Sequence, residues 1–301
     1  MEYVLQSNNL TKTYSGVHVV DHVNLNVRKG EIYGFVGKNG AGKTTFLRLI
    51  LGMAVPSEGS FTLFGNDDVV SGRKKIGGLI ESPALYNNMS AADNLSIIAD
   101  LADADVKKNA EILDLVGLAD TGRKKAKDFS LGMRQRLGIG MALVGDPEFI
   151  VLDEPINGLD PTGIIEVREL ILKLNKEYGK TILISSHILD ELNKVATCYG
   201  IISRGRLVEE ITADEVLARC SNGVLIKTDN SKKAKEILSK ILPDADIVFT
   251  ADDTLLIRAE VENTGTLTKA LFENNVIVES VSKETNSMEK YFVSRMEGKT
   301  V

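Results

Sequence analysis

The chain has 301 residues, of which 43% are hydrophobic and 26% are charged, and its formal net charge is −6. This length allows one large domain with a small one, or two of medium size, with room for a buried core. The acidic balance argues against a broad basic face, so no nucleic-acid partner is expected.

The sequence carries no recognisable signal for export or membrane insertion. Its first residues, MEYVLQSNNL, lack a basic segment followed by an apolar one, so no secretory leader is expected. No apolar run reaches the roughly 18 residues needed to cross a bilayer. Cys198 and Cys220 have no metal-like spacing and indicate packing roles in a reducing compartment. These features predict a cytoplasmic protein.

Residues 1 to about 65 are predicted to form short strands around a glycine-rich loop. The candidate strands are EYVLQS, HVVDHVNLNV, EIYGFVG and GSFTLFG. The stretch GFVGKNGAGKTTFLRLI, residues 34–50, runs from a buried strand through the loop into a helix. The order strand, glycine loop, helix is the setting that a phosphate-binding loop requires.

The glycine-rich loop also has the residue spacing of a phosphate-binding loop. Gly37, Gly40 and Gly42 tolerate positive φ and close approach, so backbone N–H groups can converge on one anion. The helix that follows adds about half a unit of positive charge, and Lys43 adds a full charge. This pattern predicts a bound nucleotide triphosphate, with Thr44 as a ligand of Mg²⁺. The predicted nucleotide-binding residues in the loop are Gly37, Lys38, Asn39, Gly40, Ala41, Gly42, Lys43, Thr44 and Thr45.

From about residue 84 to residue 145 the pattern is helical. The segments NLSIIADLA, VKKNAEILDLVGL and GMRQRLGIGMALV carry apolar residues three and four positions apart. Strands return at EFIVLD and TILISS, which are separated by the helical TGIIEVRELILKLNKE. The alternation predicts a parallel, helix-covered α/β core that carries a largely helical insert.

The strand in EFIVLDEP, residues 148–155, ends in two adjacent carboxylates, Asp153 and Glu154. Unpaired buried carboxylates cost several kcal/mol, and a bound cation relieves that cost. Because strand side chains alternate, the two carboxylates should point in different directions. One can then hold Mg²⁺ while the other faces an attacking water. The structural alternative is an acidic strand cap before a turn at Pro155.

After GRLVEE and the amphipathic TADEVLARC the pattern changes. From about residue 222 the chain runs GVLIKTD, SKKAKEILSKIL, DIVFTA, DTLLIRAE, TGTLTKALFEN and VIVESVS. This β-α-β-β-α-β order predicts a small ferredoxin-like α+β domain at residues 221–301, following a domain at residues 1–220. We expect a packing or regulatory module, because no cluster of reactive residues is visible there.

Taken in order, the motifs of residues 1 to about 220 resemble the ATP-binding subunit of an ABC transporter. FSLGMRQRL, residues 129–137, lies where that family carries its LSGGQ signature. INGLDP resembles the loop that follows the catalytic carboxylate, and ILISSHILDEL resembles the strand that precedes the switch histidine. The resemblance implies a P-loop NTPase (ABC ATPase) core with an antiparallel β subdomain and a helical subdomain at about 84–145.

The resemblance implies a role for each matching residue near the nucleotide. Glu154 is expected to be the catalytic base, and His187 is expected to contact the γ-phosphate as a second catalytic residue. Asp153 is expected to hold Mg²⁺ together with Thr44. Tyr14 stands at about the position where the family stacks an aromatic ring on adenine, and stacking reads a base face without identifying the base.

The resemblance further implies a head-to-tail homodimer that closes on ATP. The expected contacts to the partner's nucleotide are Ser130, Leu131, Gly132 and Met133 of the signature segment. Ser130 is a helix-start residue, which supplies a second anion-binding helix terminus. Leu131 and Met133 depart from the family's glycine and glutamine. Asp160 is expected in the loop that crosses the dimer interface.

Glu81, within GGLIESPALYNN, stands where most family members have a glutamine. A carboxylate ligates Mg²⁺ with more charge than an amide does, so Glu81 is predicted to be a catalytic residue and a Mg²⁺ ligand. Together with SLGMRQRL, this residue makes the chain resemble the subgroup that exports or confers immunity to antimicrobial peptides such as bacitracin and lantibiotics.

The resemblance implies an ATPase that uses ATP and Mg²⁺ to power a separate transmembrane permease. The protein would then lie peripherally on the inner face of the cell membrane, held there by the permease. The alternative is a soluble ABC-type ATPase acting as a regulatory or translation-associated factor. A single cassette without sustained heptads disfavours it. A nucleotide-binding module with vestigial catalysis is a third option, which the intact Lys43, Asp153, Glu154 and His187 disfavour.

Overall fold

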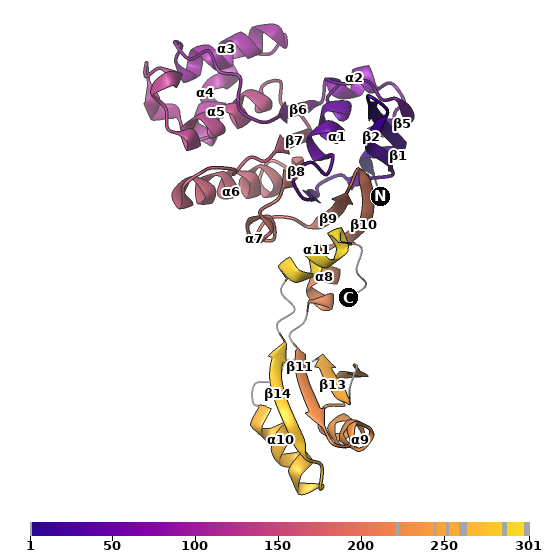
Figure 1. Cartoon of the computed structure of the whole chain (residues 1–301). Coiled ribbons are helices and arrows are strands. Elements are labelled where there is room, and N and C mark those ends of the chain that lie inside the picture. The colour runs from indigo at the N-terminus through magenta and orange to yellow at the C-terminus, as the bar shows by residue number, and fades with distance from the viewer. Residues whose placement is uncertain are drawn as a thin grey trace. The chain divides into compact units, whose positions relative to one another are not determined.

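The computed structural model describes residues 2–220, 223–243, 245–250, 253–258, 264–284 and 288–297. The chain divides into two compact units (Figure 1). Each unit has its own hydrophobic core. Of the described residues, those at 2–213 and 294–297 form the first unit, and those between 214 and 293 form the second. The sequence places a boundary at residue 220, whereas the contacts group residues 214–220 with the second unit.

The long strand β1 (Tyr3–Tyr14) organises an antiparallel sheet at the start of the first unit. Its partners are β2 (Val17–Val23), β3 (Asn26–Arg28) and β5 (Glu58–Leu63). The sequence predicts β2 and β3 as one strand, HVVDHVNLNV, and this prediction is wrong. Ser7 interrupts the run, because its hydroxyl accepts a hydrogen bond from the Leu25 N–H at 2.8 Å and donates to the Val23 carbonyl at 3.0 Å.

A six-stranded sheet in the order β10-β9-β4-β8-β7-β6 forms the centre of the first unit. Its strands are β4 (Ile32–Val36), β6 (Ile76–Leu79), β7 (Phe149–Asp153), β8 (Thr181–Ser186), β9 (Cys198–Ser203) and β10 (Arg206–Thr212). All neighbours pair in parallel except β9 and β10. Every residue of β4, β7 and β8 is buried, which is why these strands read as apolar runs.

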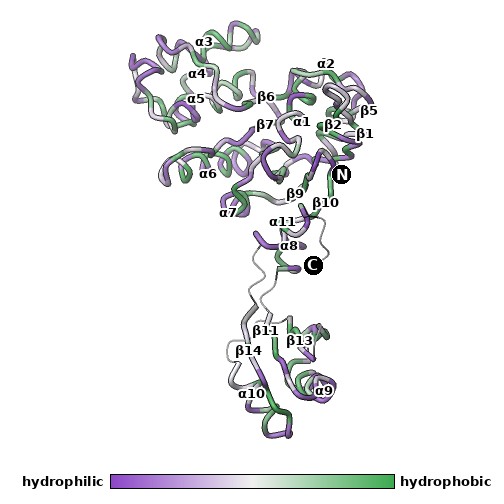
Figure 2. The backbone as a smooth tube through the Cα atoms, in the orientation of Figure 1, coloured by the Kyte–Doolittle hydropathy of each residue, from purple (hydrophilic) through white to green (hydrophobic). Residues whose placement is uncertain are grey.

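Two sets of helices accompany this sheet. Near it lie α1 (Lys43–Ile50), α6 (Pro161–Lys176) and α7 (Leu189–Leu192), whereas α2 (Val69–Arg73) contacts β5 of the antiparallel sheet. The helical subdomain contains α3 (Ala91–Leu101), α4 (Asn109–Leu115) and α5 (Leu131–Leu143), with the 3₁₀ turns η1 (Val106–Lys108), η2 (Ala119–Thr121) and η3 (Ala126–Asp128). Figure 2 shows polar and apolar residues alternating along α6. Its apolar face buries Val167, Leu170 and Leu174.

The second unit has the ferredoxin-like arrangement predicted from the sequence. Its antiparallel sheet runs β12-β13-β11-β14, with β11 (Gly223–Thr228), β12 (Asp246–Phe249), β13 (Thr254–Arg258) and β14 (Val278–Glu284). Its helices α9 (Ser231–Ile241) and α10 (Thr264–Glu273) contribute Leu238 and Leu271 to the core. The predicted strand ends at residues 251 and 259–260 lie outside the described residues.

Two short helices occur near the division between the units. They are α8 (Ala213–Arg219) and α11 (Met288–Met296). The Arg219 guanidinium donates a hydrogen bond to the Tyr291 hydroxyl at 2.7 Å, which joins α8 to α11. Beyond that point, the Ser203 hydroxyl donates to the Met296 carbonyl at 2.8 Å, and Arg295 pairs with Glu209 at 3.0 Å. The end of the described chain therefore returns to β9 and β10.

Both cysteines are free and partly buried. Burial raises the pKa of the Cys198 thiol to about 12 and also raises the pKa of Cys220. Both thiols therefore stay protonated at neutral pH, where the thiolate would be the reactive form.

The contact between β6 and α5 allows no side chain at Gly77. A Cβ on Gly77 would lie 1.8 Å from the backbone oxygen of Ala142. We predict that Gly77→Ala lowers the free energy of unfolding by about 1–3 kcal/mol, because a backbone carbonyl cannot rotate away as a side chain can. Thermal and urea unfolding followed by circular dichroism would measure this loss.

Gly140→Ala provides the control for that prediction. A Cβ on Gly140 would meet the Cγ2 of Ile112 at 3.3 Å, a contact with a side chain that can adjust. We expect a much smaller change, partly offset by the better helix propensity of alanine. Equal losses in the two variants would contradict the packing explanation.

Candidate active site

The topology of the central sheet brings the predicted motifs together at one edge. The phosphate loop, residues 37–42, joins the end of β4 to the start of α1. β4 pairs in parallel with β8, which pairs in parallel with β7. The carboxyl ends of these strands therefore lie together, and ligands of open α/β sheets bind at that edge. Asp153 ends β7, and His187 directly follows β8.

The loop closes tightly at Gly42, which precedes the first residue of α1. Its φ is 106°, a left-handed conformation that favours glycine. A Cβ on Gly42 would lie 2.4 Å from the backbone oxygen of Val19. The close approach of β2 thus requires glycine here for space as well as for backbone conformation.

The Lys43 ammonium group is buried inside the loop, with 5% of the residue exposed. It donates a hydrogen bond to the Gly37 carbonyl at 2.7 Å and pairs with Glu154 Oε1 at 3.3 Å. The other carboxylate oxygen of Glu154 lies 2.7 Å from His187 Nδ1. Glu154 therefore links the positive charge of the loop to the histidine that follows β8.

Asp153 faces a different set of groups from Glu154. Thr44 Oγ1 donates a hydrogen bond to Asp153 Oδ2 at 2.7 Å, and the Ser185 hydroxyl donates to Asp153 Oδ1. Asp153 is 1% exposed. The adjacent hydroxyl and carboxylate oxygens are hard ligands of the kind that Mg²⁺ prefers, so Thr44 and Asp153 fit the ion predicted from the sequence.

Ser130 of the signature segment and Asp160 each cap a helix of their own chain. The Ser130 hydroxyl caps α5 by accepting a hydrogen bond from the Met133 N–H at 3.2 Å, and Asp160 caps α6 by accepting from the Gly163 N–H at 3.0 Å. Leu131 is half exposed. Across the described residues, no hydrogen bond or ion pair joins the signature segment, residues 130–133, to the phosphate loop.

Tyr14 and Glu81 lie outside the contacts that join the loop, Asp153 and Glu154. Tyr14 ends β1 with 47% of the residue exposed, and the Lys12 ammonium lies 5.0 Å from its ring centroid. The Glu81 carboxylate accepts a hydrogen bond from Arg48 of α1 at 2.7 Å, and the Glu81 side chain is 62% exposed. Their predicted contacts with nucleotide and Mg²⁺ remain predictions.

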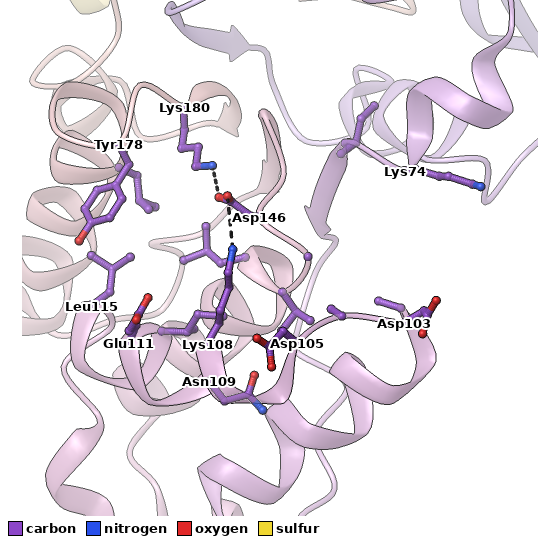
Figure 3. Close-up of a pocket in the computed structure, with 18 of the residues that line it drawn as sticks. Lys74, Asp103, Asp105, Lys108, Asn109, Glu111, Leu115, Asp146, Tyr178 and Lys180 are labelled. Atoms are coloured by element: carbon purple, nitrogen blue, oxygen red, sulfur yellow. Dashed lines mark hydrogen bonds and ion pairs between the residues drawn. The ribbon is translucent and has the colours of Figure 1, made fainter.

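A cavity of about 1080 Å³ lies between the helical subdomain and the sheet (Figure 3). Lys180 and Lys108 approach Asp146 to 2.6 Å and 3.9 Å, and the hydrogen bond from Lys180 holds the pKa of Asp146 below its usual range. Ile76, which starts β6, and Lys180, which precedes β8, place this cavity at the amino-terminal edge of the sheet. It is therefore remote from the phosphate loop.

Sequence comparison finds relatives along the whole chain. The ABC transporter family matches residues 20–157. YcbN of Bacillus subtilis, an uncharacterized ABC transporter ATP-binding protein, is 39% identical over 100% of this chain and 99% of its own. The bacitracin transport ATP-binding protein BcrA of Enterococcus faecalis is 39% identical, covering 97% of this chain and 96% of its own. The lantibiotic transport ATP-binding protein SrtF of Streptococcus pyogenes is 40% identical, covering 69% of this chain and 90% of its own.

Solved structures give the same picture of the fold. An ATP-binding cassette of an ABC transporter in its ADP conformation matches with a TM-score of 0.66 and 25% identity, covering 72% of this chain and 95% of that one. A dimeric cassette in a post-hydrolysis state, bound to ADP and Pi, matches with a TM-score of 0.62 and 26% identity, covering 69% and 98%. The predicted α/β P-loop core is confirmed.

The burial of Lys43 generates a prediction for nucleotide binding. We predict that Lys43→Ala weakens the affinity for Mg-ATP by about 10- to 100-fold, because a charged hydrogen-bond donor to the phosphates is lost. Titration with a fluorescent ATP derivative would measure the change. Lys180→Ala is the control, since Lys180 also forms an ion pair with only 12% of its side chain exposed, but at the opposite edge of the sheet. Equal affinities in the two variants would contradict the assignment.

Proposed function

This chain belongs to the ATP-binding proteins of ABC transporters, and from that premise we propose that its cassette, residues 1–220, hydrolyses Mg-ATP to drive a separate permease. One observation carries the catalytic part of the proposal. Glu154 lies between the Lys43 ammonium group and the His187 ring, and it directly follows the candidate Mg²⁺ ligand Asp153. A base, an electrophile and a metal ligand are thereby grouped within reach of one phosphate.

Each side chain has a separate role in the proposed hydrolysis. The loop N–H groups and Lys43 would bind the phosphates, and Thr44 and Asp153 would hold Mg²⁺, which would neutralise phosphate charge when bound. Glu154 accepts a proton from the attacking water. His187 Nδ1 lies 2.7 Å from the Glu154 carboxylate, where His187 would orient that carboxylate. We also assign to His187 the contact with the γ-phosphate.

The proposal includes a homodimer that forms on ATP binding. Ser130 caps α5 through the Met133 N–H, and among the described residues no polar contact joins residues 130–133 to the phosphate loop of the same chain, so we assign them to a partner's nucleotide. α5 has thirteen residues, and its N-terminal end suits an anion. Asp160 caps α6 and would thereby order the loop proposed to cross the interface.

We place the protein on the inner face of the membrane through its permease, with an antimicrobial peptide as cargo. No helix within the described ranges is both long enough and apolar enough to span a bilayer. The assignment of the pore to another chain rests on the relatives, which are named as ATP-binding proteins of transporters. The named functions of the bacitracin and lantibiotic relatives support the cargo class. Glu81 would act as a further Mg²⁺ ligand, reaching the ion after its ion pair with Arg48 opens.

Residues 221–301 are proposed to be an accessory domain with a packing or regulatory role. The described part of this region has a compact core in which Leu238, Leu255 and Leu271 are fully buried. After this core the chain returns to the cassette unit, in which Arg295 pairs with Glu209. We therefore expect that removal of residues 221–301, which include Arg295, lowers the stability of the cassette.

The role of Glu154 gives the direct test of the proposed hydrolysis. We predict that Glu154→Gln lowers ATP turnover by about 10²- to 10⁴-fold, because the amide cannot accept the proton of the attacking water. Equilibrium binding of Mg-ATP should persist, and the variant should accumulate as a dimer in size-exclusion chromatography with ATP. Glu191→Gln, which removes an ion pair of α7 with Arg168, is the control. Turnover by Glu154→Gln at the rate of the control would reject the mechanism.

Truncation after residue 220 tests the accessory domain. It removes the contacts of Arg295 with Glu209 and of Ser203 with Met296, so we predict a lower melting temperature for the cassette. Differential scanning calorimetry would measure the loss, and Arg295→Ala in the full chain would isolate the ion pair. If the truncated chain keeps its stability, its dimerisation with ATP and its transport activity, the proposed role is excluded.

A further inference from the structure

Ser185 lies within the segment ILISSHILDEL, two residues before His187, although the sequence assigns it no role. It is the fifth residue of β8 and is fully buried. The parallel registers place it beside Phe35 of β4 on one side and beside Asp153 of β7 on the other. Ser185 therefore lies between the strand that leads into the phosphate loop and the strand that ends in the two carboxylates.

The Ser185 hydroxyl contacts both carboxylate residues at once. It donates a hydrogen bond to Asp153 Oδ1, while Thr44 donates to Oδ2 of the same carboxylate at 2.7 Å. It also accepts a hydrogen bond from the backbone N–H of Glu154 at 3.1 Å. One buried hydroxyl thus satisfies an acceptor of the candidate metal ligand and a donor of the candidate base.

The contact with Glu154 coincides with an unusual backbone conformation. The φ of Glu154 is 50°, in the left-handed region that side-chain-bearing residues rarely adopt. Such conformations persist where surrounding contacts hold them, and they cluster at functional sites. The Glu154 N–H is held at 3.1 Å by both the carbonyl oxygen and the hydroxyl of Ser185. This turn directs the Glu154 side chain toward Lys43 and His187 rather than along the strand.

We propose that Ser185 is a positioning residue that orients the Asp153 carboxylate toward Mg²⁺ and fixes the Glu154 backbone for catalysis. The inference rests on the proposed function and deepens it. With Oδ1 occupied by Ser185, the other oxygen of Asp153 is directed to Thr44, which places the two candidate metal ligands side by side. Supporting hydrogen bonds of this kind fix the orientation of metal ligands.

The test compares Ser185→Ala with Thr181→Val in the full-length chain. Thr181 begins the same strand, is 1% exposed, and its hydroxyl accepts a hydrogen bond from the Gly30 N–H at 2.9 Å at the opposite edge of the sheet. Both variants delete a buried hydroxyl from β8, and both should lower the melting temperature. Only Ser185→Ala should affect the catalytic edge.

Two readouts separate positioning from general stability. In Ser185→Ala, kcat for ATP should fall by about 10- to 100-fold while KM changes little, and the Mg²⁺ concentration for half-maximal binding of a fluorescent ATP derivative should rise by about tenfold. Thr181→Val should change neither value. Should Ser185→Ala fail to fold, Ser185→Cys keeps the volume with a weaker donor and should show the same direction of change.

Particular outcomes overturn the inference. One such outcome is a Ser185→Ala variant that keeps the wild-type Mg²⁺ requirement and kcat. The other is an equal loss in Ser185→Ala and Thr181→Val. Either result would show that Ser185 contributes only to packing. A wild-type chain that binds Mg-ATP without hydrolysing it would reject the proposed ATPase mechanism instead. In that case the Mg²⁺ dependence of nucleotide binding still tests the role of Ser185.

Discussion

The site depends on the contacts of one buried charge, the ammonium group of Lys43. A charge so nearly removed from water must be compensated, and the Gly37 carbonyl and the Glu154 carboxylate provide that compensation. Through these contacts, the Lys43 side chain connects the start of α1 to the first residue of the phosphate loop and to Glu154, which directly follows β7. The same ammonium group is the one that a triphosphate requires, so the stability of the loop and its affinity for nucleotide have a common electrostatic origin.

The two adjacent carboxylates gain separate roles from the geometry of one turn. Asp153 is the last residue of a fully buried strand, and within the described ranges its carboxylate accepts hydrogen bonds from two hydroxyls, those of Thr44 and Ser185. Glu154 follows in a left-handed conformation and meets charged or titratable groups, Lys43 and His187. Neighbours in the chain therefore sit in different electrostatic environments, which allows one to hold a cation while the other accepts a proton.

The order of the motifs and the type of most elements could be predicted from local signals. Apolar runs identified β4, β7 and β8, and the β-α-β-β-α-β pattern identified the second unit. The sequence pattern does not identify β6 and β9 as strands, because Gly77, Gly78 and Gly200 interrupt their apolar runs. The break between β2 and β3 was missed because it depends on the Ser7 side chain, which reaches it from another strand.

The sequence by itself determined the class of ligand and the family, because loop spacing, helix starts and apolar periodicity are properties of short segments. Only the tertiary structure decided which groups meet. Thr44 and Asp153 are 109 positions apart, and Asp153 and Ser185 are 32 apart, so their contacts arise only once β8 lies between β4 and β7. Ser185 had no local signal of its own, since a buried serine at the end of a strand acquires its role from the strands on either side.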